Sequence, residues 1–98
     1  MKIVILIPVF NDWQSVYKLL ENINFEVSSL DHKFSAIIIN DASTEANPGL
    51  SNNLDHLSSI KIFNMKENRG HARCNAAGLK HIFENEEFDY VIPMDADG

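Results

Sequence analysis

The chain has 98 residues, 45% of them hydrophobic, which is enough for one small domain with a single core and too few for two. Its formal net charge is −6 and its 8 Lys and Arg residues are scattered, which argues against a nucleic-acid partner. The single cysteine, Cys74, excludes an internal disulfide, so a reducing, cytoplasmic setting is expected.

Four short apolar runs predict four strands, at residues 3–10, 34–39, 60–65 and 90–94. Three of them are nearly continuous in apolar, β-branched residues, as in parallel strands that helices cover on both faces. The run at 60–65 partly alternates, which predicts an edge strand. No run is long enough to cross a bilayer, so we expect no membrane segment in this chain, although a longer parent protein could carry one and be membrane-associated.

Between the first two strands lies the clearest helical segment. Asn11 or Asp12 can cap it. Its predicted buried face consists of Trp13, Val16, Tyr17, Leu20 and Ile23.

Two further helices are expected. Within the polar crossover 42–59, only residues 50–57 leave room for a short one. The last helix should begin at Gly70 or His71 and end near Asn85. Its predicted inward residues are Ala72, Ala76, Leu79 and Phe83, and Cys74 is interpreted as a core residue.

This order of strands and helices predicts an α/β fold, a Rossmann-like three-layer αβα sandwich around a mostly parallel sheet of about four strands. We expect residues 1–98 to form one domain. Polar residues follow the carboxyl end of every predicted strand, at 11–12, 40–43, 68–71 and 95–97. Since ligands of open parallel sheets bind outside the carboxyl ends of the strands, this edge is the predicted site.

Asp95 and Asp97 are the most informative pair. In an extended chain their side chains face the same way, roughly 6.5–7 Å apart. Mg²⁺ or Mn²⁺ takes one or two carboxylates from a protein and completes its shell with phosphate and water. The alternative is a solvated turn after a strand. A calcium loop of the EF-hand type is disfavoured, because no helix precedes the pair.

Other polar residues near the strand ends keep two interpretations each. Asp41 can accept a hydrogen bond from the N–H of a base, or cap a turn with Ser43 or Thr44. Asp12 caps the first helix, and Pro8 and Phe10 beside it can wall a base pocket. Around 68–73, a glycine and two arginines at a helix N-terminus favour an anion, with Arg73 the better ligand candidate. His71 is structural or catalytic.

Four ordered segments, at residues 5–12, 37–44, 68–79 and 95–97, resemble the N-terminal, nucleotide-binding half of a family 2 glycosyltransferase of the GT-A type. The second differs from the usual Asp-Gly-Ser-Thr pattern, because Ala42 replaces the glycine. The third is similar to the branch that transfers sugars to polyprenyl or dolichyl phosphate. The fourth matches the metal-binding Asp-x-Asp motif. The resemblance spans essentially the whole chain.

The resemblance implies glycosyl transfer, with inversion, from a UDP- or GDP-sugar to an acceptor. The residues implied to bind substrate are Pro8, Phe10, Asp12, Asp41, Arg73 and Asp95, and those implied to bind Mn²⁺ or Mg²⁺ are Asp97 and Asp95. Within this set, Asp41 would pair with the base, Asp95 would approach the ribose, and Asp97 would hold the metal that bridges the diphosphate.

In this family the catalytic base and the acceptor site follow the Asp-x-Asp motif, where this chain stops. We therefore expect a domain truncated after that motif, without catalytic residues of its own, inactive alone, and self-associating through an exposed sheet edge. The alternative is a non-catalytic nucleotide- or phosphate-binding α/β module. A phosphoacceptor receiver domain is excluded, because the third predicted strand ends in Met65-Lys66 without an aspartate.

Overall fold

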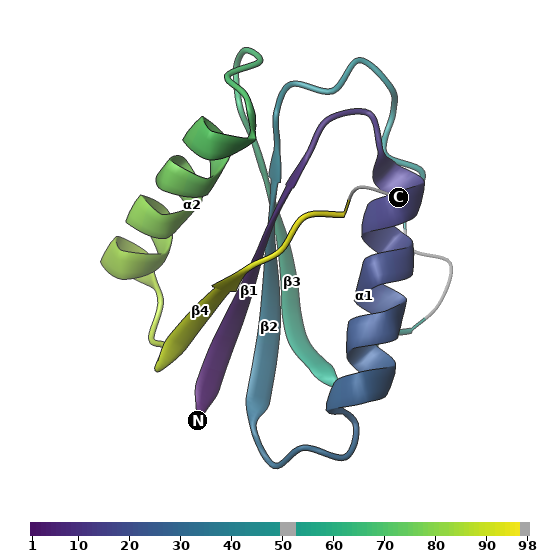
Figure 1. Ribbon diagram of the computed structural model, residues 1–98, viewed down its shortest axis with the longest axis vertical. Coiled ribbons are helices and arrows are strands. Elements are labelled where there is room, and N and C mark those ends of the chain that lie inside the picture. Colours follow the sequence, from purple (N-terminus) through teal and green to yellow (C-terminus); the bar gives the residue numbers. More distant parts are fainter. Residues whose placement is uncertain (50–52, 97–98) are drawn as a thin grey trace.

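The computed structural model describes residues 1–49 and 53–96. Its elements are β1 (Lys2–Val9), α1 (Trp13–Val27), β2 (Lys33–Asn40), β3 (Leu57–Asn64), α2 (His71–Asn85) and β4 (Tyr90–Pro93). The strands form one sheet in the order β3-β2-β1-β4, and every neighbouring pair is parallel. Helices α1 and α2 flank the sheet on opposite sides (Figure 1). The predicted three-layer α/β fold is therefore confirmed.

Strand β1 shows why the strand sequences are continuously apolar. Its side chains alternate between two cores, with Ile5 and Ile7 on the α1 side and Val4 and Leu6 on the α2 side. All four side chains are buried because a helix covers each face. A central strand of such a sheet has no face left for water, so a polar residue within it would be costly.

Strand β3 is an edge strand, as its alternating sequence predicts. It begins at Leu57, three residues before the predicted Ile60. The short helix predicted at 50–57 is wrong over its described part, because residues 53–56 are not helical and residues 50–52 lie outside the described residues. The backbone N–H of His56 instead donates to the side chain of Asn24 on α1 (2.9 Å). So short a helix gains few internal hydrogen bonds to offset its nucleation cost.

Helix α1 has the predicted buried face. Its buried residues are Trp13, Val16, Leu20, Ile23 and Val27, and Tyr17 is partly buried against the same core. The three-and-four spacing of large residues thus identified both the helix and its inward side.

Helix α2 spans the predicted residues, but its predicted inward face is wrong. The buried residues are Cys74, Gly78 and Ile82, spaced four apart, whereas Phe83 is 72% exposed. Ala72 and Ala76 are also exposed, and Leu79 is only partly buried. The physical reason is close packing on the sheet: a Cβ placed on Gly78 would lie 2.5 Å from Cδ1 of Leu6. The first two turns of the helix therefore lie close to the sheet through Cys74 and Gly78, and the larger Ile82 covers the sheet one turn later.

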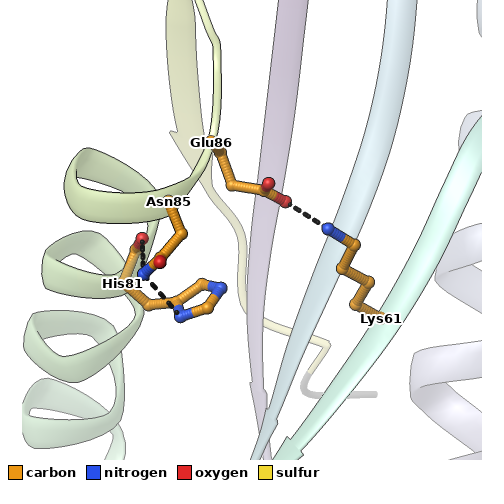
Figure 2. Close-up of polar contacts among 4 residues, drawn as sticks. All are labelled: Lys61, His81, Asn85 and Glu86. Atoms are coloured by element: carbon orange, nitrogen blue, oxygen red, sulfur yellow. Dashed lines mark hydrogen bonds and ion pairs between the residues drawn. The ribbon is translucent and has the colours of Figure 1, made fainter.

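Figure 2 shows how the C-terminal end of α2 is fixed over the sheet. Glu86, directly after the helix, accepts a hydrogen bond from Lys61 of β3 (2.8 Å). One turn earlier, the His81 ring lies against Phe63 of β3, with ring centroids 4.3 Å apart. The Asn85 side chain donates to the His81 carbonyl (3.0 Å). The contacts of Glu86 and His81 tie the exit from α2 to the edge strand β3, which is separated from β4 by β2 and β1. Within the described residues, no helix is long and apolar enough to cross a membrane.

Candidate functional site

The carboxyl ends of β1, β2 and β3 are level with one another. Val9 pairs with Asn40, and Asn40 pairs with Asn64, so the three following loops start from one line. Strand β4 stops earlier, with Pro93 opposite Leu6. The chain after β4 then turns toward the α1 side (Figure 1), where Met94 and Ala96 pack against the α1-side core. The described polar segments that follow the four strands therefore lie at one edge of the sheet, which we call the rim.

Asn11 joins the loop after β1 to the loop after β2. Its backbone N–H donates to the Ser43 hydroxyl (2.9 Å), and its side-chain N–H donates to the Thr44 hydroxyl (2.9 Å). Its side-chain oxygen accepts the backbone N–H groups of Thr44 (2.8 Å) and Glu45 (2.9 Å). Asp12 is the N-cap residue of α1, one of the two positions predicted, but its side chain makes no capping hydrogen bond.

Asp41 joins the loop after β2 to the turn that leads into α2. It is 1% exposed. One carboxylate oxygen accepts the backbone N–H of Arg69 (2.7 Å), and the other accepts the backbone N–H of Gly70 (2.8 Å). The anion that the sequence predicts at this helix N-terminus is thus, in part, the chain's own carboxylate.

These contacts set the protonation state of Asp41. Burial alone would raise its pKa, but the hydrogen bonds from Arg69 and Gly70, a hydrogen bond from the Cys74 thiol and the charge of His71 together lower the pKa below its ordinary 3.8. Asp41 is therefore a carboxylate at neutral pH. Burial first, and then the bond to Asp41 and its negative charge, raise the pKa of Cys74 to about 11. Cys74 is 0% exposed, which confirms its interpretation as a core residue.

Ala42 explains how the chain accommodates the departure from a glycine at this position. Its φ is +56°, in the left-handed region that glycine adopts without strain. The turn therefore keeps a glycine-like backbone with an alanine in it, at a cost of about 1–2 kcal/mol.

A small cavity at the rim gathers residues from three of the four segments. Its volume is about 70 Å³, and its lining includes Pro8, Phe10, Asp12, His71 and Ala96. That volume holds about two water molecules. A cavity of this volume is too small to enclose a nucleoside. Three residues predicted to border a nucleoside are thus brought beside the N-terminus of α2 and the chain after β4.

His71 and Asp95 connect the last two segments. The His71 Nδ1 lies 3.9 Å from a carboxylate oxygen of Asp95, whose side chain is 63% exposed. Arg73, one turn into α2, is exposed, and among the described residues no hydrogen bond or ion pair reaches its guanidinium. Asp97 lies outside the described residues. The roles of these residues as ligand contacts stay predictions.

Oxygen donors suit the metals that the sequence analysis names. The exposed Asp95 carboxylate offers such a donor at the rim, and Mg²⁺ or Mn²⁺ needs only one or two of them from a protein. Within residues 1–49 and 53–96, no three His, Cys, Asp or Glu side chains cluster as a metal-binding group. A dedicated protein cage is therefore not built from the described residues, and a metal shared with a phosphate ligand fits them better.

A larger hollow, of about 810 Å³, lies at the opposite end of the strands and is lined by Lys2, Lys33, Asp55 and Glu87 among others. Two of its charged side chains already pair with each other, since Lys2 Nζ lies 2.6 Å from Glu87. The Lys2 backbone N–H also donates to Asp89 (2.7 Å). Because ligands of open parallel sheets bind at the carboxyl ends, the rim is the stronger candidate despite its smaller cavity.

Comparison with known proteins identifies the family of the chain. The chain is 28% identical over 93 residues, covering 95% of its length, to the undecaprenyl-phosphate 4-deoxy-4-formamido-L-arabinose transferase of Pseudomonas syringae pv. syringae (strain B728a). It spans only 27% of the length of that relative. The model of the family described as glycosyl transferase family 2 matches residues 4–98, so the chain belongs to that family.

Proposed function

We propose that this chain binds the nucleotide diphosphate part of a UDP- or GDP-sugar across the rim and contributes that site to a glycosyltransferase. The observation that supports the proposal most directly is the cavity at the rim, which collects Pro8, Phe10 and Asp12 beside His71 and Ala96. Family membership and the transferase name of the relative support the same reading. For the whole protein we propose sugar transfer with inversion, to an acceptor that these residues do not identify.

Each rim segment has a proposed task. Phe10, which is 41% exposed, offers an aromatic surface for a base, and Asp12 borders the nucleoside. Asp95 and Asp97 would hold Mn²⁺ or Mg²⁺, which supplies Lewis-acid stabilisation of the departing diphosphate when bound. Arg73 has a free guanidinium among the described residues, and its position in the first turn of α2 suits a phosphate oxygen.

The proposal has two further parts. Residues 1–98 alone bind nucleotide weakly and transfer no sugar, since they correspond to 27% of the relative's length. They also self-associate through β4, an edge strand on which Tyr90 is 56% exposed. Sugar transfer by the isolated chain would contradict the first part, and a monomer by sedimentation at high concentration would contradict the second.

Calorimetry with UDP and GDP, with and without Mn²⁺, tests the central proposal. We expect binding that strengthens at least about tenfold with the metal, because the metal joins the diphosphate to the chain. The matched variants are Asp95→Asn, which should remove the metal dependence, and Asp31→Asn, an exposed acid near the opposite end of the strands, which should not change it. Metal-independent binding would instead favour a non-catalytic nucleotide- or phosphate-binding module.

A further inference from the structure

The turn that leads into α2, at residues 68–70, is hydrogen-bonded to a carboxylate of the chain itself. Asp41 accepts both backbone N–H groups of this turn, those of Arg69 and Gly70, with one oxygen each. The Asp41 carbonyl lies 3.4 Å from the side-chain nitrogen of Asn68, at the limit of a hydrogen bond. Three consecutive residues before the helix are thus held by one buried aspartate from the loop after β2.

The position of this turn decides where the next residues lie. His71 follows Gly70 directly, lines the cavity at the rim and approaches Asp95 to 3.9 Å. Gly70 itself has φ +87°, a conformation that fixes the direction in which the chain enters α2. Any loosening of the turn would therefore move His71 and the first turn of α2 relative to the carboxyl ends of the strands.

We infer that Asp41 is a positioning residue, which fixes the turn at Arg69 and Gly70 and thereby sets His71 and Arg73 at the rim before any ligand binds. The inference rests on the proposed function, because the site being set is the donor site. It gives Asp41 a task that is independent of the base, whereas the family resemblance implies that Asp41 pairs with the base. The burial of Asp41 favours the positioning task, since only 1% of the residue is exposed.

The two tasks predict different ligand dependence. If Asp41 positions the turn, its loss weakens every ligand that uses the rim, including inorganic pyrophosphate, which has no base. If Asp41 reads the base, its loss weakens one nucleotide and leaves pyrophosphate unchanged. If only the charge of Asp41 mattered, removing it would strengthen the binding of all anions, because like charges repel. The sign and the ligand pattern therefore separate the three cases.

The first measurement needs no ligand. Amide hydrogen exchange by NMR on the wild-type chain should show Arg69 and Gly70 protected, and Asp41→Asn should speed their exchange by about tenfold or more while the amides of Ile37 and Ile38 in β2 stay protected. The control variant Asp31→Asn should change none of them. Unprotected Arg69 and Gly70 amides in the wild type would overturn the inference, even if the variant failed to fold.

The second measurement compares pyrophosphate, UDP and GDP by calorimetry in the presence of Mg²⁺. Asp41→Asn should lower the affinity for all three by a similar factor, about tenfold. A loss confined to one nucleotide, or a gain for all three, would overturn the inference. A wild-type chain that binds none of the three would refute the proposed function, while the exchange rates would still decide whether Asp41 fixes the turn.

Discussion

Helix α1 packs on the sheet through large side chains such as Trp13 and Leu20, whereas α2 packs through Cys74, Gly78 and Ile82. Their N-termini differ as well. The entry to α1 is tied across the rim by the Asn11 amide, and the entry to α2 by the Asp41 carboxylate. In both cases the residue that fixes a helix entry reaches a neighbouring loop. The contrast teaches that spacing finds a helix face made of large residues and misses one that includes a buried glycine and a buried cysteine.

The largest expected effect tests which face of α2 is buried. Ile82→Ala should lower the free energy of unfolding by about 3 kcal/mol, because Ile82 is 0% exposed and leaves a cavity. Its neighbour Phe83 is 72% exposed, and it contacts Phe88 edge-on, with ring centroids 5.1 Å apart. Phe83→Ala should therefore cost less than about 1 kcal/mol. Urea unfolding of the two variants measures the difference, and equal losses would contradict the observed face.

The next effect concerns the entry to α2. Asp41→Asn should cost about 2 kcal/mol at pH 7, because an amide cannot accept both backbone N–H groups with its two end atoms. The folded-state pKa of Asp41 is lowered, so its stabilising contribution is fully present above the unfolded value of 3.8 and is lost as pH falls through the folded pKa. The difference in stability between wild type and variant should therefore narrow below about pH 4.

Chemical denaturation at several pH values from 7 downward measures this narrowing. Taking the difference between the two proteins cancels the titration of the other carboxylates. A difference that stays constant down to the lowest pH would show that the charge of Asp41 does not contribute.

The entry to α1 should respond to Asn11 more than to Asp12. Asn11→Ala removes three side-chain hydrogen bonds to the loop after β2, which should cost about 1–2 kcal/mol. Asp12→Ala should cost less than about 0.5 kcal/mol, because the Asp12 side chain makes no capping bond. Thermal unfolding of both variants provides the test, and the reverse order would restore Asp12 as the cap.

The smallest expected effect is a gain. Ala42→Gly should relieve the left-handed backbone of Ala42, worth about 1–2 kcal/mol, while the added freedom of the unfolded chain costs about 0.5–1 kcal/mol. A net stabilisation of about 0.5 kcal/mol is expected. A lower melting temperature for this variant would mean that the alanine methyl group makes contacts that outweigh the strain.

The sequence alone predicted the four strands, their parallel orientation, the edge position of β3 and the extent of α2. These features follow from runs of apolar residues, whose burial does not depend on distant partners. The inward face of α2 could not be predicted in this way, because Gly78 is buried by its fit against Leu6 and Ile39, which are far from it in the chain. The prediction placed the large apolar Phe83 in the core, and this residue is in fact exposed.

At the rim, too, the sequence did not predict contacts between residues that are far apart in the chain. Asn11 and Asp41 stood out as polar residues after strands, and the structure places both at the rim. Their hydrogen-bond partners could not be predicted, because those partners are backbone groups of other loops. Asn11 and Ala42 both have a left-handed φ in the structure. Asparagine adopts this conformation readily, so Asn11 gives a signal of a sharp turn, whereas an alanine at position 42 gives none.

The reactivity of Cys74 reports on how firmly the N-terminal part of α2 stays packed on the sheet. With its pKa raised to about 11 and its sulfur inaccessible, the thiol is almost entirely protonated at neutral pH and unreactive toward alkylating reagents in the folded chain. Modification requires the first turns of α2 to separate from the sheet or the chain to unfold, so the rate of alkylation records how often Cys74 becomes accessible. Because these 98 residues contain a single cysteine, mass spectrometry can follow its alkylation without an engineered label.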